Sequence, residues 1–200
     1  MTDDILQALP ARRGHFRLES GYHTDLWLTL DALFVDPAAL APLVAALADR
    51  LRPYGITAVC GPLLGGAFLA HALAAHLGVR FYFAQPVAGV SDGGLFRAQY
   101  RLPSELRRRV AHERVALVDD VISAGSSVRA TTVELDAAGA SVVVVGSLLQ
   151  LGDQANEYFA PRGMPMVALA QHPFNLWAPD ACPLCRAGVA LADPAPRPSS

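Results

Sequence analysis

The sequence predicts an α/β protein with a central parallel sheet and flanking helices. Along the chain, apolar runs rich in branched residues alternate with glycine-containing loops and helical patterns, which is typical of parallel strands joined by crossover helices. The 200 residues are 52% hydrophobic and 17% charged, so the chain can fill the core of one ordinary domain. We find no segment with the composition of a linker, and we expect a single domain over residues 1–200.

A helix is predicted before the first strand of the sheet. Asp36 and Pro37 form a favourable N-cap and first helical position. The apolar spacing from Leu40 to Leu51 then predicts an amphipathic helix that ends before Pro53.

Four strands and two crossover helices follow. The first crossover helix extends to about Leu77 and is closed by Gly78. The second crossover helix covers residues 128–138, with Gly139 at its C′ position. A loop over residues 119–126 precedes this second helix. The predicted strands are 56–60, 79–84, 115–118 and 141–149.

Two segments do not fit this alternation. Residues 85–103 form a glycine-containing excursion that is too long for an ordinary connection, and such loops are usually lids. Residues 14–31 contain short extended runs around Ser20-Gly21 that can cover the end of the sheet. We therefore divide the domain into an N-terminal hood (1–35), a core (36–150) with a flexible loop (85–103), and a loose proline-containing tail (191–200).

Charge and cysteine content narrow the classes of function. All 16 basic residues are arginines, so a lysine Schiff base and a Walker phosphate loop are excluded. The net charge is −2 and the arginines are scattered, so we expect no nucleic-acid partner. No run of 18 apolar residues and no secretory peptide is recognisable, and three cysteines do not make a disulfide framework. We expect a cytoplasmic protein without a membrane segment.

The strongest motif is the run from Val115 to Ser127, in which an apolar strand ends in Asp119 and Asp120 and a small-residue loop opens a helix. Ligands of open parallel sheets bind beyond the carboxyl ends of the strands. Residues 123–127 offer backbone N–H groups, hydroxyls and a helix N-terminus to a phosphate. The two carboxylates can accept hydrogen bonds from vicinal hydroxyls or hold magnesium through water. Together they predict a ribose 5-phosphate site.

The motif has two other interpretations. The acids can simply end a strand and cap the next helix, with the serines as turn residues. A dinucleotide site is disfavoured because no Gly-x-Gly-x-x-Gly follows a strand and the second strand ends at Gln85, where such sites carry an acid.

Residues 115–127 resemble the phosphoribosyl-diphosphate signature of type I phosphoribosyltransferases. Residues 60–67 resemble the pyrophosphate loop of that family, which implies a non-proline cis peptide at Leu63–Leu64. Residues 14–25 resemble the N-terminal segment of orotate phosphoribosyltransferases, and residues 182–189 resemble the C-terminal segment of some bacterial members. The resemblance implies the Rossmann-like type I fold, a homodimer, and Mg²⁺-dependent transfer of a phosphoribosyl group from 5-phospho-α-D-ribose 1-diphosphate (PRPP) to a nucleobase, with orotate as the leading candidate.

The resemblance also implies roles for individual residues. Asp119 and Asp120 would hold the ribose hydroxyls, with Mg²⁺ bound mainly through the substrate, and Arg97 and Arg101 would reach the leaving diphosphate from the loop. The PRPP-binding residues would further include Leu63, Leu64, Gly65 and Gly66 at the diphosphate and Ser123, Ala124, Gly125, Ser126 and Ser127 at the 5-phosphate. The base would contact Ser20, Gly21, His23 and Tyr100.

The chain departs from the orotate enzymes at three places. Residues 93–103 contain neither lysine nor histidine, Glu19 replaces a basic residue, and Gln150 stands where those enzymes carry an arginine for the substrate carboxylate. A buried carboxylate without a cationic partner is costly. Transfer to another base, such as a salvage purine, and non-catalytic binding of PRPP by a regulator are therefore the alternatives.

Two further groups carry no assigned role. Cys182 and Cys185 offer half of a zinc site, with Cys60 or His172 as remote partners, but local packing is favoured because a second close pair is lacking. The arginines at 107–109 are interpreted as a solvated helix face.

Overall fold

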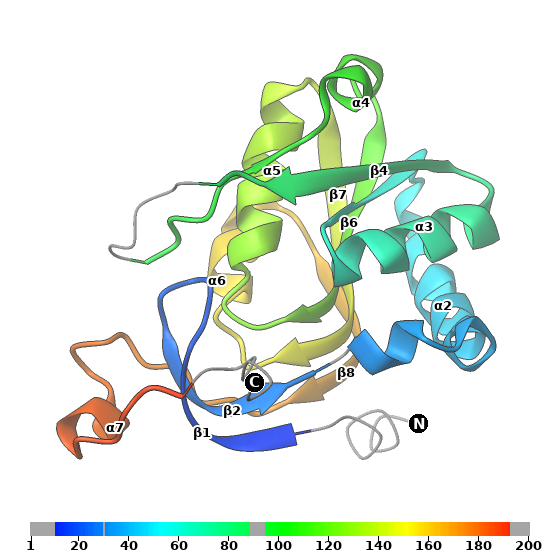
Figure 1. Cartoon of the computed structure of the whole chain (residues 1–200). Coiled ribbons are helices and arrows are strands. Elements are labelled where there is room, and N and C mark those ends of the chain that lie inside the picture. The colour runs from blue at the N-terminus through cyan, green and yellow to red at the C-terminus, as the bar shows by residue number, and fades with distance from the viewer. Residues whose placement is uncertain (1–10, 30, 89–94, 193–200) are drawn as a thin grey trace, which may run out of the picture.

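The computed structural model describes residues 11–29, 31–88 and 95–192 (Figure 1). These residues form a six-stranded sheet with helices on both faces and a separate two-stranded hairpin. The strand order of the large sheet is β5-β4-β3-β6-β7-β8, so the chain begins in the middle of the sheet and adds strands on both sides. None of the helices in the described ranges is long and apolar enough to cross a membrane.

Five strands of the large sheet run parallel, among them the four that the sequence predicted. The sixth, β5, is a two-residue edge strand that pairs antiparallel with β4, so the sheet is mixed. The strands are β3 (Ala58–Pro62), β4 (Arg80–Pro86), β5 (Tyr100–Arg101), β6 (Arg114–Ile122), β7 (Ser141–Leu151) and β8 (Met166–His172).

Helices cover both faces because the central strands are apolar on both sides. Helices α2 (Pro37–Leu51) and α3 (Gly65–Leu77) pack on one face, and α5 (Ser126–Ala137) packs on the other. Asp36 caps α2 by accepting hydrogen bonds from the N–H groups of Ala38 and Ala39, as its position predicted. The shorter helices are α4 (Ser104–Arg109), α6 (Asn156–Phe159), α7 (Pro183–Arg186), η1 (Asp31–Phe34), η2 (Arg52–Tyr54) and η3 (Ala160–Arg162).

The core consists of two apolar layers separated by the sheet. Leu47, Leu69 and Leu148 belong to the layer under α2 and α3. Leu117 and Phe159 belong to the layer under α5. All five side chains are fully buried, and burial of this kind is worth about 1.5–3 kcal/mol for each side chain. The layers hold the strand ends of β3 and β6 rigidly.

The hood is an antiparallel hairpin of β1 (Ala11–Arg17) and β2 (His23–Leu28). Gly21 has a φ of 84° in the turn between the strands, a conformation that glycine adopts without strain. The hairpin lies beside the C-terminal segment, since His23 and Trp177 exchange backbone hydrogen bonds of 2.8 and 2.9 Å. The amide of Ala192 donates a further hydrogen bond of 2.7 Å to the carbonyl of His15. The two ends of the described chain are thus joined.

Some predicted boundaries were wrong. We predicted that the third sheet strand ends at Val118, but β6 continues to Ile122 because residues 119–122 pair with β7. Strands β5 and β8 were not predicted. Residues 89–94 of the predicted flexible loop and residues 193–200 of the predicted tail lie outside the described residues.

Candidate active site

The two acids lie side by side in β6 at the carboxyl edge of the sheet. Asp119 is 8% exposed, and the hydroxyl of Ser127 donates a hydrogen bond of 2.7 Å to its Oδ2. Backbone N–H groups also serve the carboxylates: that of Asp120 donates to Asp119 Oδ1 at 3.1 Å, and that of Val121 donates to Asp120 Oδ1 at 2.9 Å. The strand end and the start of α5 therefore orient both carboxylates.

The turn after β3 packs directly against these carboxylates. A Cβ atom at Gly65 would lie 2.5 Å from Asp120 Oδ2, and one at Gly66 would lie 2.6 Å from Asp119 Oδ1. Only glycine permits such an approach. The peptide bond Leu63–Leu64 is cis, as the resemblance implied. The residues expected at the diphosphate and the two acids, which come from separate motifs, thus meet at one place.

Both acids are harder to ionise than a free aspartic acid. Burial raises the pKa of Asp119 well above its ordinary value, and the neighbouring Asp120 raises it further. Burial also raises the pKa of Asp120. Two crowded carboxylates of this kind favour a bound cation or hydrogen-bond donors such as sugar hydroxyls.

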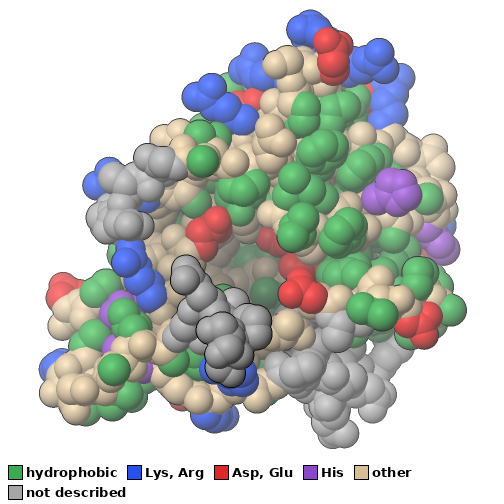
Figure 2. Space-filling view, in the orientation of Figure 1, with side chains coloured by type: hydrophobic (Ala, Val, Ile, Leu, Met, Phe, Trp, Pro, Cys, Tyr) green, Lys and Arg blue, Asp and Glu red, His purple; other side chains and the backbone are tan. Residues whose placement is uncertain are grey.

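An anion-sized recess lies next to the acids, between the hood and the start of α5. Its volume is about 170 Å³. The amide of Arg129 donates to the carbonyl of Gly125 at 2.9 Å as the first helical bond, so the amides of residues 126–128 have no helical partner. Figure 2 shows acidic side chains around the hollow in this face. The recess is lined by Leu18, Glu19, Ser20 and Trp27 of the hood and by residues 121–127.

The hood and the loop before α4 meet beside this recess. The hydroxyl of Tyr100 donates a hydrogen bond of 2.9 Å to Glu19 Oε1, and the amide of Phe96 donates one of 2.9 Å to the carbonyl of Ser20. The surroundings desolvate the Glu19 carboxylate and raise its pKa, while the hydrogen bond from Tyr100 lowers it. Sequence reasoning missed Phe96, which follows no motif, and it treated Glu19 only as a departure.

The loop arginines are less constrained than the acids. Arg97 and Arg101 are both exposed. Arg101 lines a second pocket of about 530 Å³ together with Phe96 and Arg129. The guanidinium of Arg129 lies 3.9 Å from the centroid of the Phe96 ring and donates to the carbonyl of Gln154 at 2.9 Å. Sequence reasoning gave Arg129 no role, because nothing in the helical pattern distinguishes it from a surface arginine.

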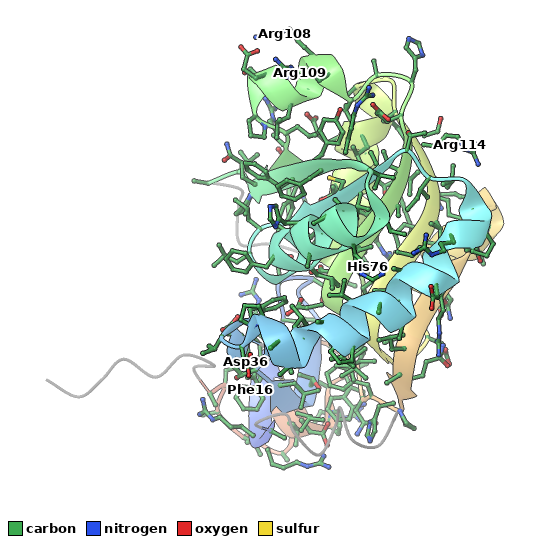
Figure 3. All side chains as sticks on the ribbon, turned by 90° about the vertical axis from the view of Figure 1, so that its right-hand side faces the viewer. Phe16, Asp36, His76, Arg108, Arg109 and Arg114 are labelled. Carbon is green, nitrogen blue, oxygen red and sulfur yellow. The ribbon has the colours of Figure 1, made fainter. Side chains whose placement is uncertain are left out.

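Gln150 occupies the position at which orotate enzymes were expected to carry an arginine. It is buried, and its amide donates to the carbonyl of Gly152 at 3.1 Å. Its polar atoms are therefore engaged within the fold. The run at 107–109 lies far from the hood, since Figure 3 shows Arg108 and Arg109 at one end of the molecule and Phe16 at the other.

His23, expected at the base, has other partners. Its Nδ1 lies 2.9 Å from His15 Nε2 and 3.3 Å from Cys185 Sγ, and His23 does not line the recess described above. Burial lowers the pKa of His23, and the neighbouring His15 and Arg17 lower it further. The expectation that Cys60 or His172 would be the remote partner of the cysteine pair is wrong, because the hairpin brings His15 and His23 to the cysteines.

The carboxyl edge of the parallel sheet carries paired carboxylates, a glycine turn and a recess at a helix N-terminus. This combination is typical of α/β proteins that bind a phosphorylated ligand. The model of the phosphoribosyl transferase domain matches residues 34–173. The chain belongs to this family.

Individual relatives agree with this assignment. The orotate phosphoribosyltransferase of Wolinella succinogenes is 31% identical over 195 residues, covering 92% of this chain and 90% of the relative. That of Thermotoga maritima is 32% identical over 198 residues, covering 98% of each. The crystal structure of the Aeropyrum pernix orotate phosphoribosyltransferase superimposes with a TM-score of 0.65 at 25% identity, covering 86% of this chain and 93% of that one.

Proposed function

We propose that the protein transfers the phosphoribosyl group of PRPP to a ring nitrogen of orotate and releases diphosphate. The observation that carries the proposal is the meeting of Asp119 and Asp120 with the glycine turn at 65–66 and the recess at the start of α5. The family, and relatives named orotate phosphoribosyltransferase over almost the full chain, support the reaction and the base.

The recess would bind the 5-phosphate. The amides of residues 126–128, which have no helical partner, and the hydroxyls of Ser123 and Ser126 would donate to the phosphate oxygens, while the hydroxyl of Ser127 stays on Asp119. The two carboxylates would then accept hydrogen bonds from the ribose hydroxyls. Glu19 and Ser20 of the hood would lie over the bound sugar, with the base between the hood and the sheet edge.

The diphosphate would lie at residues 63–66, next to the acids. The amide of Leu63 donates to the carbonyl of Ala84, but the first helical bond of α3 comes from Ala67, so the amides of residues 64–66 have no helical partner. The donor set fits magnesium, since Asp119 and Asp120 offer hard carboxylate oxygens. When bound with the diphosphate, Mg²⁺ neutralises charge on the leaving group. Arg97 and Arg101 would add positive charge from the loop.

The chain's own contribution to catalysis is positioning and charge. As the bond between the sugar carbon and the diphosphate lengthens, positive charge develops on the ribose, and the two carboxylates stabilise it. The nitrogen of the base then forms its bond to the same carbon on the opposite face, the carbon–oxygen bond to the diphosphate breaks, and the N–H proton of the base passes to the departing diphosphate or to solvent. Loop closure would exclude the water that otherwise intercepts the sugar.

The test measures diphosphate release with PRPP, Mg²⁺ and a panel of orotate, uracil, guanine, xanthine and adenine. We expect turnover with orotate alone. The variant Asp119→Asn/Asp120→Asn should lower kcat/KM by about 100-fold or more, since it removes charge that stabilises the transition state. The matched control is Asp180→Asn, which changes an exposed acid that does not line the recess, and it should retain activity.

The outcomes separate the candidates. Turnover with a purine in place of orotate would assign a purine as the substrate. This is the alternative because Gln150 replaces the expected arginine and the loop lacks lysine. Tight PRPP binding without turnover on any base would indicate a regulator. Near-normal activity of the double variant would refute the roles of the two acids.

A further inference from the structure

Four metal-binding side chains converge away from the recess. His15, His23, Cys182 and Cys185 each offer one ligand atom, and these four atoms lie within 4.8 Å of one another. Figure 2 shows histidine side chains at the lower left of the molecule, where Figure 1 places β1 and α7. The proposed transfer reaction uses none of the four as reacting groups.

The hairpin explains how the two histidines meet. His15 lies where the register of β1 against β2 shifts, between Arg13 and Phe16, and it is buried next to the buried Phe16. Such an irregularity breaks strict alternation and redirects a side chain. The His15 ring therefore turns towards His23 on β2, with ring centroids 4.8 Å apart.

The cysteines come from a single turn at the other end of the chain. Cys182 precedes α7 and Cys185 lies within it, so that the three-residue spacing places both thiols on one side. Cys182 is fully buried and Cys185 is exposed. The β-bridge between His23 and Trp177 brings this segment to the hairpin.

The distances match a tetrahedral zinc site. Zn–S bonds of about 2.3 Å and Zn–N bonds of about 2.0–2.1 Å place sulfur about 3.5 Å from nitrogen, and two nitrogens about 3.3 Å apart. The Sγ–N distances to His15 Nε2 are 3.5 and 3.7 Å, that from Cys185 to His23 Nδ1 is 3.3 Å, and the two nitrogens are 2.9 Å apart. The other two pairs of ligand atoms lie within 4.8 Å of each other, so small side-chain adjustments around an ion would bring the four atoms to tetrahedral positions.

The neighbours of His15 support metal binding. Its Nδ1 lies 2.7 Å from the carbonyl of Val189, which can only accept a hydrogen bond, so Nδ1 carries the proton and the lone pair of Nε2 faces the cluster. Metal-bound histidines commonly donate their other N–H to a backbone carbonyl in this manner. Two thiolates and two neutral imidazoles around Zn²⁺ carry no net charge, which suits a largely buried position.

We propose that His15, His23, Cys182 and Cys185 bind one structural zinc ion that joins the N-terminal hairpin to the C-terminal segment. With four protein ligands the site is closed, as structural zinc sites are. The turn at residues 18–22 lies between the two histidine ligands, and it carries Glu19 and Ser20 into the recess. The ion would therefore fix the hood, and its role is separate from the reaction.

Metal content gives the first test. Full-length protein purified without chelator, or reduced protein titrated with Zn²⁺ against a chromophoric chelator, should hold about one zinc per chain. Cys182→Ser/Cys185→Ser should lose it. Cys60→Ala is the matched control, because this third cysteine is buried in β3 outside the cluster, and it should keep the metal. Zinc bound equally by both variants would overturn the proposal.

Cobalt gives a test that needs no variant. Reduced wild-type protein loaded with Co²⁺ should show the intense visible bands of a tetrahedral ion and the near-ultraviolet charge-transfer band of cobalt–thiolate bonds. Absence of both bands with the thiols reduced, or a Cys182–Cys185 disulfide that persists in reductant, would contradict the proposal.

Stability gives the third test. In Mg²⁺-free buffer without substrate, a zinc chelator should lower the Tm of the wild type by at least about 5 °C. It should leave the Tm of the His15→Gln variant unchanged and should still act on His76→Gln, a substitution at an exposed position on α3 (Figure 3). An equal chelator effect on both variants, or none on the wild type, would contradict a structural metal.

Discussion

Asp119 combines two roles that oppose each other. It is buried next to a second carboxylate, and both surroundings raise its pKa. A folded-state pKa above the unfolded value means that the unfolded state ionises more readily. Ionisation of Asp119 therefore costs stability as the pH rises, while the proposed reaction requires its negative charge. Functional sites commonly carry such a cost.

We predict that Asp119→Asn stabilises the free protein at pH 8. Asparagine removes the buried charge and keeps one acceptor oxygen, which serves the shorter hydrogen bond from Ser127, while the longer one from the Asp120 amide is lost. The Tm should rise by several degrees, at about 2–4 °C for each kcal/mol gained. The gain should disappear near pH 4, where the wild-type carboxyl is protonated in the folded protein.

The measurement is a set of thermal unfolding curves between pH 4 and 8 in Mg²⁺-free buffer. The control is Asp180→Asn, whose Tm difference from the wild type should be small at every pH because the residue is exposed. A loss of stability at pH 8, or a gain that does not change with pH, would show that the charge of Asp119 is not the cause.

At the scale of elements, the segment between β4 and α4 contacts the hood and carries two exposed arginines. Phe96 anchors its described part to Ser20 through a backbone hydrogen bond, and Arg129 stacks on the Phe96 ring. Arg97 and Arg101 follow this anchor in the chain and are exposed. Their positive charge is available to an anionic leaving group.

We predict that Arg97→Ala/Arg101→Ala lowers kcat by about 10–100-fold without unfolding the protein. Because the removed charges are exposed, the variant should lose little stability. The diphosphate would leave more slowly, because no positive charge from the loop would stabilise it. Steady-state kinetics with PRPP and orotate check this. The matched control is Arg108→Ala/Arg109→Ala at the far end of the molecule (Figure 3). Equal kinetics for the two double variants would remove the loop arginines from the mechanism.

Helices and strands could be predicted from the sequence where the apolar periodicity and the capping residues indicate the same boundaries. Helix α2 follows the Asp36 cap and Pro37, and α3 ends at Gly78, which has a φ of 69°. Strand β5 could not be predicted because it has two residues, and its pairing with β4 depends on the path of the preceding loop. The extension of β6 through the acids is imposed by β7, a partner that local residue types do not reveal.

The residues of the candidate sites also differ in how well the sequence predicts them. The acids and the serine loop are contiguous in sequence, so a strand–loop–helix pattern was enough to predict them. The His–Cys cluster joins residues 159 or more positions apart, and a register shift in β1 aims one ligand. Tertiary packing alone creates that cluster. The pairing of Glu19 with Tyr100 is likewise a contact between the hood and the edge of the sheet.

At the scale of the whole molecule, an apolar patch lies beside the proposed diphosphate loop. Val35, Leu64 and Phe68 are 83%, 65% and 53% exposed, and the Phe68 ring lies 5.6 Å from that of Phe34. Contiguous exposed apolar side chains mark contact surfaces. We propose that this patch, at the start of α3, contributes to a homodimer interface next to the site.

Phe68→Arg should therefore convert a dimer into a monomer at micromolar concentration, because a buried guanidinium without a partner is costly. Sedimentation velocity measures the change. Val133→Arg, on the exposed face of α5, is the control and should leave the dimer intact. A wild-type protein that sediments as a monomer, or a variant that stays dimeric, would rule out this interface.

A crystal structure of the wild-type protein with PRPP and Mg²⁺ tests the central claim most directly. We predict the 5-phosphate within hydrogen-bond distance of the amides of residues 124–127, the ribose hydroxyls on Asp119 and Asp120, and the diphosphate at residues 63–66. A sugar phosphate bound elsewhere, with the recess at the start of α5 left to solvent, would contradict the account.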